Sequence, residues 1–176
     1  MTEYYVVYDT TTGEVRLRGS GSTGAAANQA VPSGAAVLQV PFEALSGADL
    51  NLEPIREGLI GMVNNDAGQF RLRFITDVAG QQATYLSKEE EAKAWTPQAN
   101  LSDFPFLAAE AEYTGMAIAD IVTLVLATAA AWRGLAAKIE GRRRGAMVEL
   151  AAAANVAALV RAATVDWASL VAPAAQ

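Results

Sequence analysis

The chain has 176 residues and a formal net charge of −6, with 52% hydrophobic and 18% charged residues. It contains no Cys and no His, which excludes disulfides, thiolate and imidazole metal sites, cysteine nucleophiles and histidine-dependent triads. The acidic charge disfavours nucleic acid as a partner, because proteins that bind duplexes neutralise phosphates with Lys and Arg.

The N-terminus carries the pattern of a β-hairpin. Residues 4–8 are rich in aromatic and β-branched side chains, as strands are. Residues 9–13 supply turn chemistry, with Gly13 free to take a positive φ. Residues 14–18 then alternate polar and apolar side chains, the period of a half-buried strand. Two such runs around a turn predict a hairpin.

Residues 19–24 match G-x-G-x-x-G in form. The preceding strand belongs to a hairpin rather than to a βαβ unit, so we interpret residues 19–22 as a surface loop and not as a nucleotide site. One or two helical turns are expected within residues 24–30. Residues 36–40 are expected to form a third strand.

The middle of the first half also suggests strands. Residues 59–63 are apolar, and residues 64–66 have turn composition. Residues 70–75 alternate again, which places Arg71 and Arg73 on the solvent side of the expected strand. Residues 1–80 are therefore predicted to be a small, antiparallel, β-rich domain.

Helices are expected beyond residue 80. Of 38 alanines, 24 follow residue 100, and Ala is the best helix former. Residues 85–95 fit a helix with Ser87 as cap and an i,i+4 pair between Glu89 and Lys93. The acidic triplet of residues 89–91 diverges around a helix and is not expected to bind a cation. Residues 96–100 are expected to be a linker.

Two further helices are predicted in residues 101–176. The first starts at Pro105, is capped by Ser102 or Asp103, and ends before Gly115. The second starts near Ile118 and carries a heptad-like stripe with spacing 4,3,4,3,4, formed by Ile121, Val125, Thr128, Trp132, Leu135 and Ile139. The stripe fits either a partner chain or packing inside an α-hairpin.

An arginine cluster follows the stripe. Arg142, Arg143 and Arg144 stand together in an otherwise acidic chain. They could bind a carboxylate-rich partner, contact nucleic acid weakly, or form a solvated helix face with Glu140 paired to Arg144. We place the candidate partner-binding surface on these arginines together with Ile121, Val125, Trp132, Leu135 and Ile139.

The predicted fold class is α+β, a small antiparallel β-rich N-terminal domain followed by an Ala-rich helical hairpin or coiled-coil-like half. The expected segments are residues 1–80, a short helix and linker at 81–100, and a helical association region at 101–176. The most apolar run, residues 121–132, is shorter than the roughly 20 residues of a membrane span. The N-terminus also lacks the basic start of a signal peptide. We therefore expect no membrane span and a soluble, intracellular protein.

No enzyme is expected. The chain has no G-x-S-x-G elbow and no phosphate-binding P-loop. The sequence predicts no catalytic residues, no metal and no cofactor. Its 19 acidic residues offer carboxylate pairs only by chance.

Several segments resemble a known family. Residues 5–9, followed by Thr12-Gly13 and a second strand, resemble the start of small proteins encoded beside tail-fibre genes in tailed bacteriophages. The resemblance covers most of residues 1–150, with its other segments at residues 74–86, 88–92, 106–111, 130–133 and 139–144. The whole is similar to tail-fibre assembly proteins, or tail-assembly chaperones.

The resemblance implies a non-enzymatic protein that binds a tail-fibre or baseplate protein and helps to assemble the fibre in the host cytoplasm. The alternative is a structural virion component, a fibre or baseplate adapter that stays in the particle and associates through its C-terminal helices. Self-association into a homo-oligomer is compatible with both, and neither implies nucleic acid or a membrane as partner.

Overall fold

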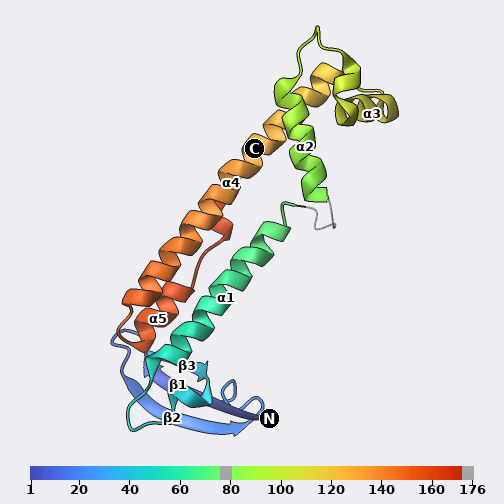
Figure 1. The fold of residues 1–176 in the computed structure, drawn as a ribbon. Helices are drawn as coiled ribbons and strands as arrows, with labels where there is room; N and C mark the ends of the chain where they lie inside the picture. The colour runs from blue at the N-terminus through green and yellow to red at the C-terminus, as the bar shows by residue number, and fades with distance from the viewer. Residues whose placement is uncertain (76–80, 172–176) are drawn as a thin grey trace. The chain divides into compact units, whose positions relative to one another are not determined.

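The computed structural model describes residues 1–75 and 81–171 and confirms the α+β class (Figure 1). Within these residues a three-stranded antiparallel sheet is followed by five α-helices. The strands are β1 (Thr2–Asp9), β2 (Val15–Ser22) and β3 (Ala35–Val40). The helices are α1 (Leu52–Leu72), α2 (Gln81–Ala94), α3 (Pro105–Thr114), α4 (Ile118–Ala152) and α5 (Val156–Ala163), with short 3-10 turns at Phe42–Ala44, Leu101–Asp103 and Ala168–Leu170.

The sheet has the order β2-β1-β3, with β1 in the centre. The predicted hairpin is confirmed, with Val6 opposite Arg18 and a register shift after Val7. Gly13 takes a φ of 77° in the turn. The predicted third strand is also confirmed and pairs antiparallel with β1. The stretch expected to hold helical turns, residues 24–30, forms hydrogen-bonded turns without a regular helix.

The loop expected at residues 19–22 is wrong, because β2 continues to Ser22. Gly19 lies opposite Tyr5 in the ladder, and a Cβ on Gly19 would stand 2.5 Å from Cζ of the Tyr5 ring. The Tyr5 hydroxyl donates a 2.8 Å hydrogen bond to Gln29. Glycine at this position thus lets the ring lie across the strand, and the glycine-rich run belongs to a sheet edge.

The strands expected at residues 59–63 and 70–75 are also wrong. Residues 59–63 and 70–72 belong to the 21-residue helix α1. Its buried residues recur every three or four positions, at Ile55, Leu59, Val63, Ala67 and Phe70. The alternation at residues 70–75 was a local coincidence at the helix end, where the guanidinium of Arg73 lies 5.4 Å from the centre of the Phe70 ring. The end of the sheet region, expected at residue 80, lies outside the described residues.

The helices predicted for the second half are confirmed, but their caps differ. Helix α2 begins at Gln81, so Ser87 lies inside it rather than at its cap. Helix α3 starts at Pro105 and ends at Thr114, as predicted before Gly115, which caps it with a φ of 71°. Its N-cap is Phe104, not Ser102 or Asp103, and it has no side-chain cap of its own. The long helix α4 stops at Ala152, and Asn155 caps α5 by accepting from the backbone N–H of Ala158.

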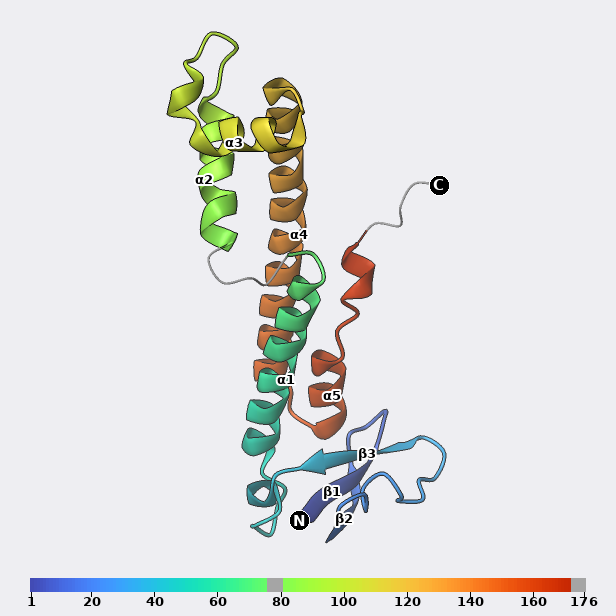
Figure 2. The ribbon, with the colours of Figure 1, turned by 90° about the vertical axis from the view of Figure 1, so that its right-hand side faces the viewer.

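The chain divides into two compact units, and neither is one continuous sequence segment. Unit 1 comprises residues 1–68 and 140–169, and unit 2 comprises residues 69–139 and 170–176. In unit 1 one face of the sheet is covered by α1, the end of α4 and α5 (Figures 1 and 2). The main core joins Val6 and Tyr8 of β1 to residues of all three helices, among them Leu59, Leu150 and Leu159.

This core overturns one expectation. The sequence predicts residues 1–80 to be a domain of their own, yet Leu150, Val156 and Leu159 are buried in the same cluster as Val6. The side chain of Arg56 adds polar contacts, donating to the carbonyls of Leu150 and Ala153 at 2.9 Å each. The segments 1–80, 81–100 and 101–176 are therefore not the spatial units of the fold.

Candidate partner-binding surface

Unit 2 is built around a small core from three helices. Its buried centre consists of Ala92 of α2, Phe104 and Leu107 at the start of α3, and Ile121 of α4. Partly buried apolar side chains surround this centre, among them Trp95, Ile118, Val122, Val125 and Leu126. Ala92 fills little volume, so a few large side chains supply most of the apolar burial in this unit.

Glu91 connects α2 to α3. Its two carboxylate oxygens accept hydrogen bonds from the backbone N–H groups of Phe106, at 3.2 Å, and Leu107, at 3.0 Å. These N–H groups lie in the first turn of α3, where an intrahelical partner is missing. The side chain of Glu91 therefore caps the N-terminus of α3, the role that was expected of Ser102 or Asp103.

Ion pairs join α2 to its neighbours. The carboxylate of Glu89 pairs with Lys93, as predicted, and also with Arg133 of α4. These two cations lower the pKa of Glu89 from its ordinary value, Lys93 contributing most. Lys88 pairs with Glu110 of α3. The members of the acidic triplet thus diverge as expected, since Glu89 and Glu91 face different partners and Glu90 is exposed.

The predicted stripe is only partly available to a partner. Ile121 and Ile139 have no exposed surface, so both pack within the chain itself. Val125 packs partly buried against the core of unit 2. Trp132 and Leu135 are half-buried and Thr128 is exposed. The stripe therefore lies along one border of the covered face of α4.

The arginine cluster lies in unit 1 and is largely engaged within the chain. Arg143 donates to both carboxylate oxygens of Glu140, at 2.9 and 2.6 Å, and to the side-chain oxygen of Asn64 on α1 at 2.7 Å. The hydrogen bond to Glu140 raises the pKa of Arg143. Arg142 lies 3.4 Å from Glu149, and Arg144 is exposed. Arg143 thus serves to hold α4 against α1.

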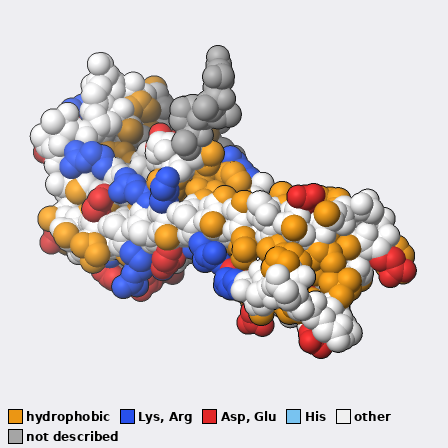
Figure 3. Space-filling view, turned by 90° about the horizontal axis from the view of Figure 1, so that it is seen from above, with side chains coloured by type: hydrophobic (Ala, Val, Ile, Leu, Met, Phe, Trp, Pro, Cys, Tyr) orange, Lys and Arg blue, Asp and Glu red, His pale blue; other side chains and the backbone are white. Residues whose placement is uncertain are grey.

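Exposed apolar side chains are concentrated in unit 2. Among the described residues, 17 large hydrophobic side chains are exposed and 11 of them belong to this unit, although it is the smaller of the two. Figure 3 shows hydrophobic side chains gathered on its surface. The 11 are Leu72, Phe74, Ile75, Tyr85, Leu86, Leu101, Phe106, Tyr113, Met116, Leu124 and Val171.

Sequence reasoning missed this surface, because it looked for one stripe on one helix. Tyr85 and Leu86 lie on α2, and Tyr113 on α3 is 86% exposed. The available indication was the mismatch between the apolar side chains of residues 69–139 and the small number that a short α-hairpin can bury. Large apolar side chains exposed in such number on one small unit favour an interaction site.

Helix α4 is also more apolar over its length than expected. It contains an 18-residue window with a mean hydropathy of 1.5, of which 6% is buried. By length and composition alone this helix is long enough to cross a membrane. The prediction from the sequence, which counted only the 12 residues 121–132 as apolar, therefore underestimated the length of the apolar segment. A span at this place would, however, carry Arg133 and its ion-pair partner Glu89 into hydrocarbon, where charged groups are costly.

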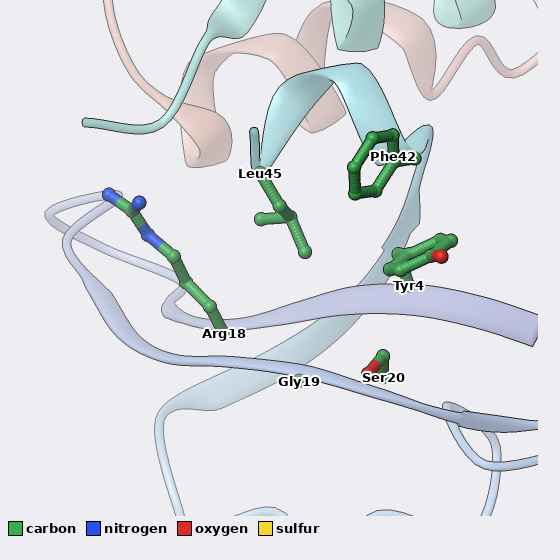
Figure 4. A pocket seen from close by; sticks show the side chains of 6 residues that line it. All are labelled: Tyr4, Arg18, Gly19, Ser20, Phe42 and Leu45. Carbon is green, nitrogen blue, oxygen red and sulfur yellow. The ribbon is translucent and has the colours of Figure 1, made fainter. Parts of the chain in front are cut away.

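An open hollow of about 290 Å³ lies in unit 1 beside β1, β2 and the 3-10 turn Phe42–Ala44 (Figure 4). Tyr4 and Phe42 line it with ring centres 5.2 Å apart, and Leu45 lies beside them. The Arg18 side chain reaches away from these rings to donate to the carbonyls of Gly47 and Ala48. With its one charged group so engaged, the hollow lacks the convergent polar groups of a small-molecule site.

Among the described residues no three Asp or Glu side chains gather as a metal site would require. The expectations that the chain has no metal, no cofactor and no catalysis remain predictions. Comparison with protein families, curated proteins and solved structures finds no match to this chain. The exposed apolar surface of unit 2, which we call the unit 2 surface, is therefore the best-supported candidate site.

Proposed function

We propose that this protein is a non-enzymatic bacteriophage tail protein that binds a tail-fibre chain and helps to assemble the fibre in the host cytoplasm. The resemblance of residues 1–150 to tail-fibre assembly proteins supplies the identity of the partner. The observation that carries a binding role is the unit 2 surface, with 11 exposed large hydrophobic side chains on one small unit.

Unit 2 exposes apolar side-chain surface that a bound partner would remove from water. Each large apolar side chain that a partner covers stabilises the complex by roughly 1.5 to 3 kcal/mol. The small core of unit 2 leaves such side chains exposed on α2, α3 and α4. These exposed apolar side chains suit transient binding of an unfinished chain.

The test is co-purification of the full chain with a co-expressed bacteriophage tail-fibre protein. Leu86→Ser and Tyr113→Ser remove exposed apolar groups of unit 2, and each is expected to weaken binding about tenfold or more. Val148→Ser is the matched control, because Val148 is 70% exposed but lies in unit 1. The proposal would be contradicted if both unit 2 variants bind the fibre protein as the wild type does, or if the wild-type protein does not co-purify with it.

A permanent virion adapter would use the same surface. A chaperone and an adapter differ in whether the protein remains in the mature particle. Mass spectrometry of purified particles therefore distinguishes the two roles. A chaperone is found in the lysate of infected cells and is absent from particles, whereas an adapter is present in both.

A further inference from the structure

The exposed face of α4 within unit 2 carries a second regular track. Every fourth or third residue along it is exposed, and the set is Asp120, Leu124, Ala127, Ala131, Gly134 and Lys138. The spacing is 4,3,4,3,4, which keeps all six on one side of a helix paired with another helix. This track, which we call the α4 ridge, lies on the side of α4 away from Val122, Val125 and Ala129, which are partly covered.

The α4 ridge is complementary to itself about Ala129. Asp120 and Lys138 stand nine residues before and after that point, Leu124 and Gly134 five, and Ala127 and Ala131 two. Two copies of the helix running antiparallel would therefore set each carboxylate against an ammonium group and each leucine against a glycine. The alanines would meet at the centre and allow close approach.

Charge selects this orientation over the parallel one. A parallel pair in register sets Asp120 beside Asp120 and Lys138 beside Lys138, and like charges at an interface are unfavourable. Shape selects it as well, because the parallel pair sets Leu124 against Leu124 and leaves the space beside Gly134 empty. A twofold axis with the same patch on both chains is the commonest symmetry of soluble oligomers.

We infer that two copies of this chain associate through the α4 ridge as an antiparallel helix pair, with Leu124 of each copy seated over Gly134 of the other. Dimerisation does not require the fibre, although Leu124 belongs to the unit 2 surface as well. From Asp120 to Lys138 the ridge is about 27 Å long at 1.5 Å per residue. One helix pair of that length buries less than the roughly 1,200 Å² of a standard interface, so the dimer dissociates readily on dilution.

Gly134→Leu is the decisive variant. A Cβ at Gly134 meets nothing within 4 Å in the single chain, and Leu is a better helix former than Gly. The variant is therefore expected to keep the fold and to weaken dimerisation at least tenfold, because the added side chain fills the space that Leu124 needs. Gly61→Leu is the matched control, since Gly61 is an exposed glycine of α1 with the same open surroundings.

Charge reversal tests the orientation. Asp120→Lys and Lys138→Asp are each expected to weaken dimerisation about fivefold, because each converts two exposed ion pairs into like-charge pairs. The double variant restores opposite charges in the antiparallel pair and is expected to recover the wild-type affinity.

The measurement is sedimentation velocity of the full chain over a dilution series, with circular dichroism to confirm the helical content of every variant. A wild-type chain that is monomeric up to its solubility limit overturns the proposal. So does a Gly134→Leu variant that dimerises like the wild type. A double charge variant that stays as weak as the single ones overturns the antiparallel arrangement.

Discussion

At the scale of single residues, glycine and aspartate in the hairpin have roles that their neighbours determine. The Tyr5 ring occupies the space that a Cβ at position 19 would need, so this position requires glycine. The hydrogen bond that the Tyr5 hydroxyl donates to Gln29 holds the ring in place. Asp9 ends β1 and organises the turn, where its carboxylate accepts from the backbone N–H groups of Thr11 and Thr12 at 2.9 Å. The sequence correctly predicted Asp9 in the turn but wrongly predicted Gly19 in a loop, and it predicted the contacts of neither residue.

Gly19→Ala is expected to destabilise the protein by about 1 to 3 kcal/mol, because the new methyl group overpacks the Tyr5 ring. Gly61→Ala, the control, has open space around its Cβ inside α1 and is expected to stabilise by roughly 0.5 to 1 kcal/mol. Urea unfolding of the two variants measures both. If the two substitutions change stability in the same direction, the proposed packing of Tyr5 on Gly19 is incorrect.

Acid should weaken the hairpin through Asp9. The N–H groups of Thr12 and Thr11, with a smaller contribution from Arg16, lower the pKa of Asp9 to about 2. A carboxyl whose pKa is lower in the folded state stabilises the fold above its unfolded pKa, and this contribution is lost as the pH falls through the folded pKa. Stability is therefore expected to fall from about pH 4 to about pH 2.

Asp9→Asn should flatten that acid dependence while keeping the turn, because an amide oxygen can accept the same two N–H groups. Thermal unfolding of both proteins from pH 2 to pH 7 provides the comparison. An equally steep acid loss in the variant would assign the effect to other carboxylates.

At the scale of elements, α1 and α3 show how tertiary contacts override local patterns. The apolar residues of α1 recur with a helical period over 21 residues, but its end contains a short alternating run that resembles a strand. A window of six residues is too short to separate the two periods. Two possible N-caps, Ser102 and Asp103, precede α3. The N–H groups of its first turn instead donate to Glu91, which lies 15 and 16 residues earlier in the sequence.

Glu91→Ala is expected to destabilise unit 2 by about 1 to 2 kcal/mol, because two N–H groups at the start of α3 lose their acceptor. Glu91→Gln keeps one acceptor oxygen and should recover part of the loss. Glu90→Ala is the matched control, because Glu90 is the exposed neighbour on the same helix. Hydrogen exchange at Phe106 and Leu107 reports the effect directly, and protection equal to that of the wild type would refute the capping role.

At the scale of the whole molecule, the fold brings together segments far apart in the chain. Arg56 donates to carbonyls 94 and 97 residues later, and the core beneath the sheet is completed by residues 146–163. A domain boundary drawn from composition alone follows the change from strands to helices. The actual units are instead determined by which apolar faces cover one another.

A fragment of residues 1–80 is accordingly expected not to fold on its own, since the apolar side chains on one face of its sheet would lose Leu150, Val156 and Leu159. Burial of each of these side chains contributes roughly 1.5 to 3 kcal/mol to the free energy of folding. That is a large part of the stability of a small unit. The full chain is the control. A cooperative thermal transition of the isolated fragment would show that the sheet and α1 suffice.

The sequence by itself determined the α+β class, the hairpin, the third strand and the helices of the second half, because each depends on local period, turn residues or helix propensity. It also located the half-buried Trp132 and Leu135 on one stripe. Only the tertiary structure decided that α1 is a helix, that Glu91 caps α3, that Ile121 and Ile139 are core, and that residues 140–169 complete the first unit. Those outcomes depend on which distant face covers each element, and local sequence does not specify that choice.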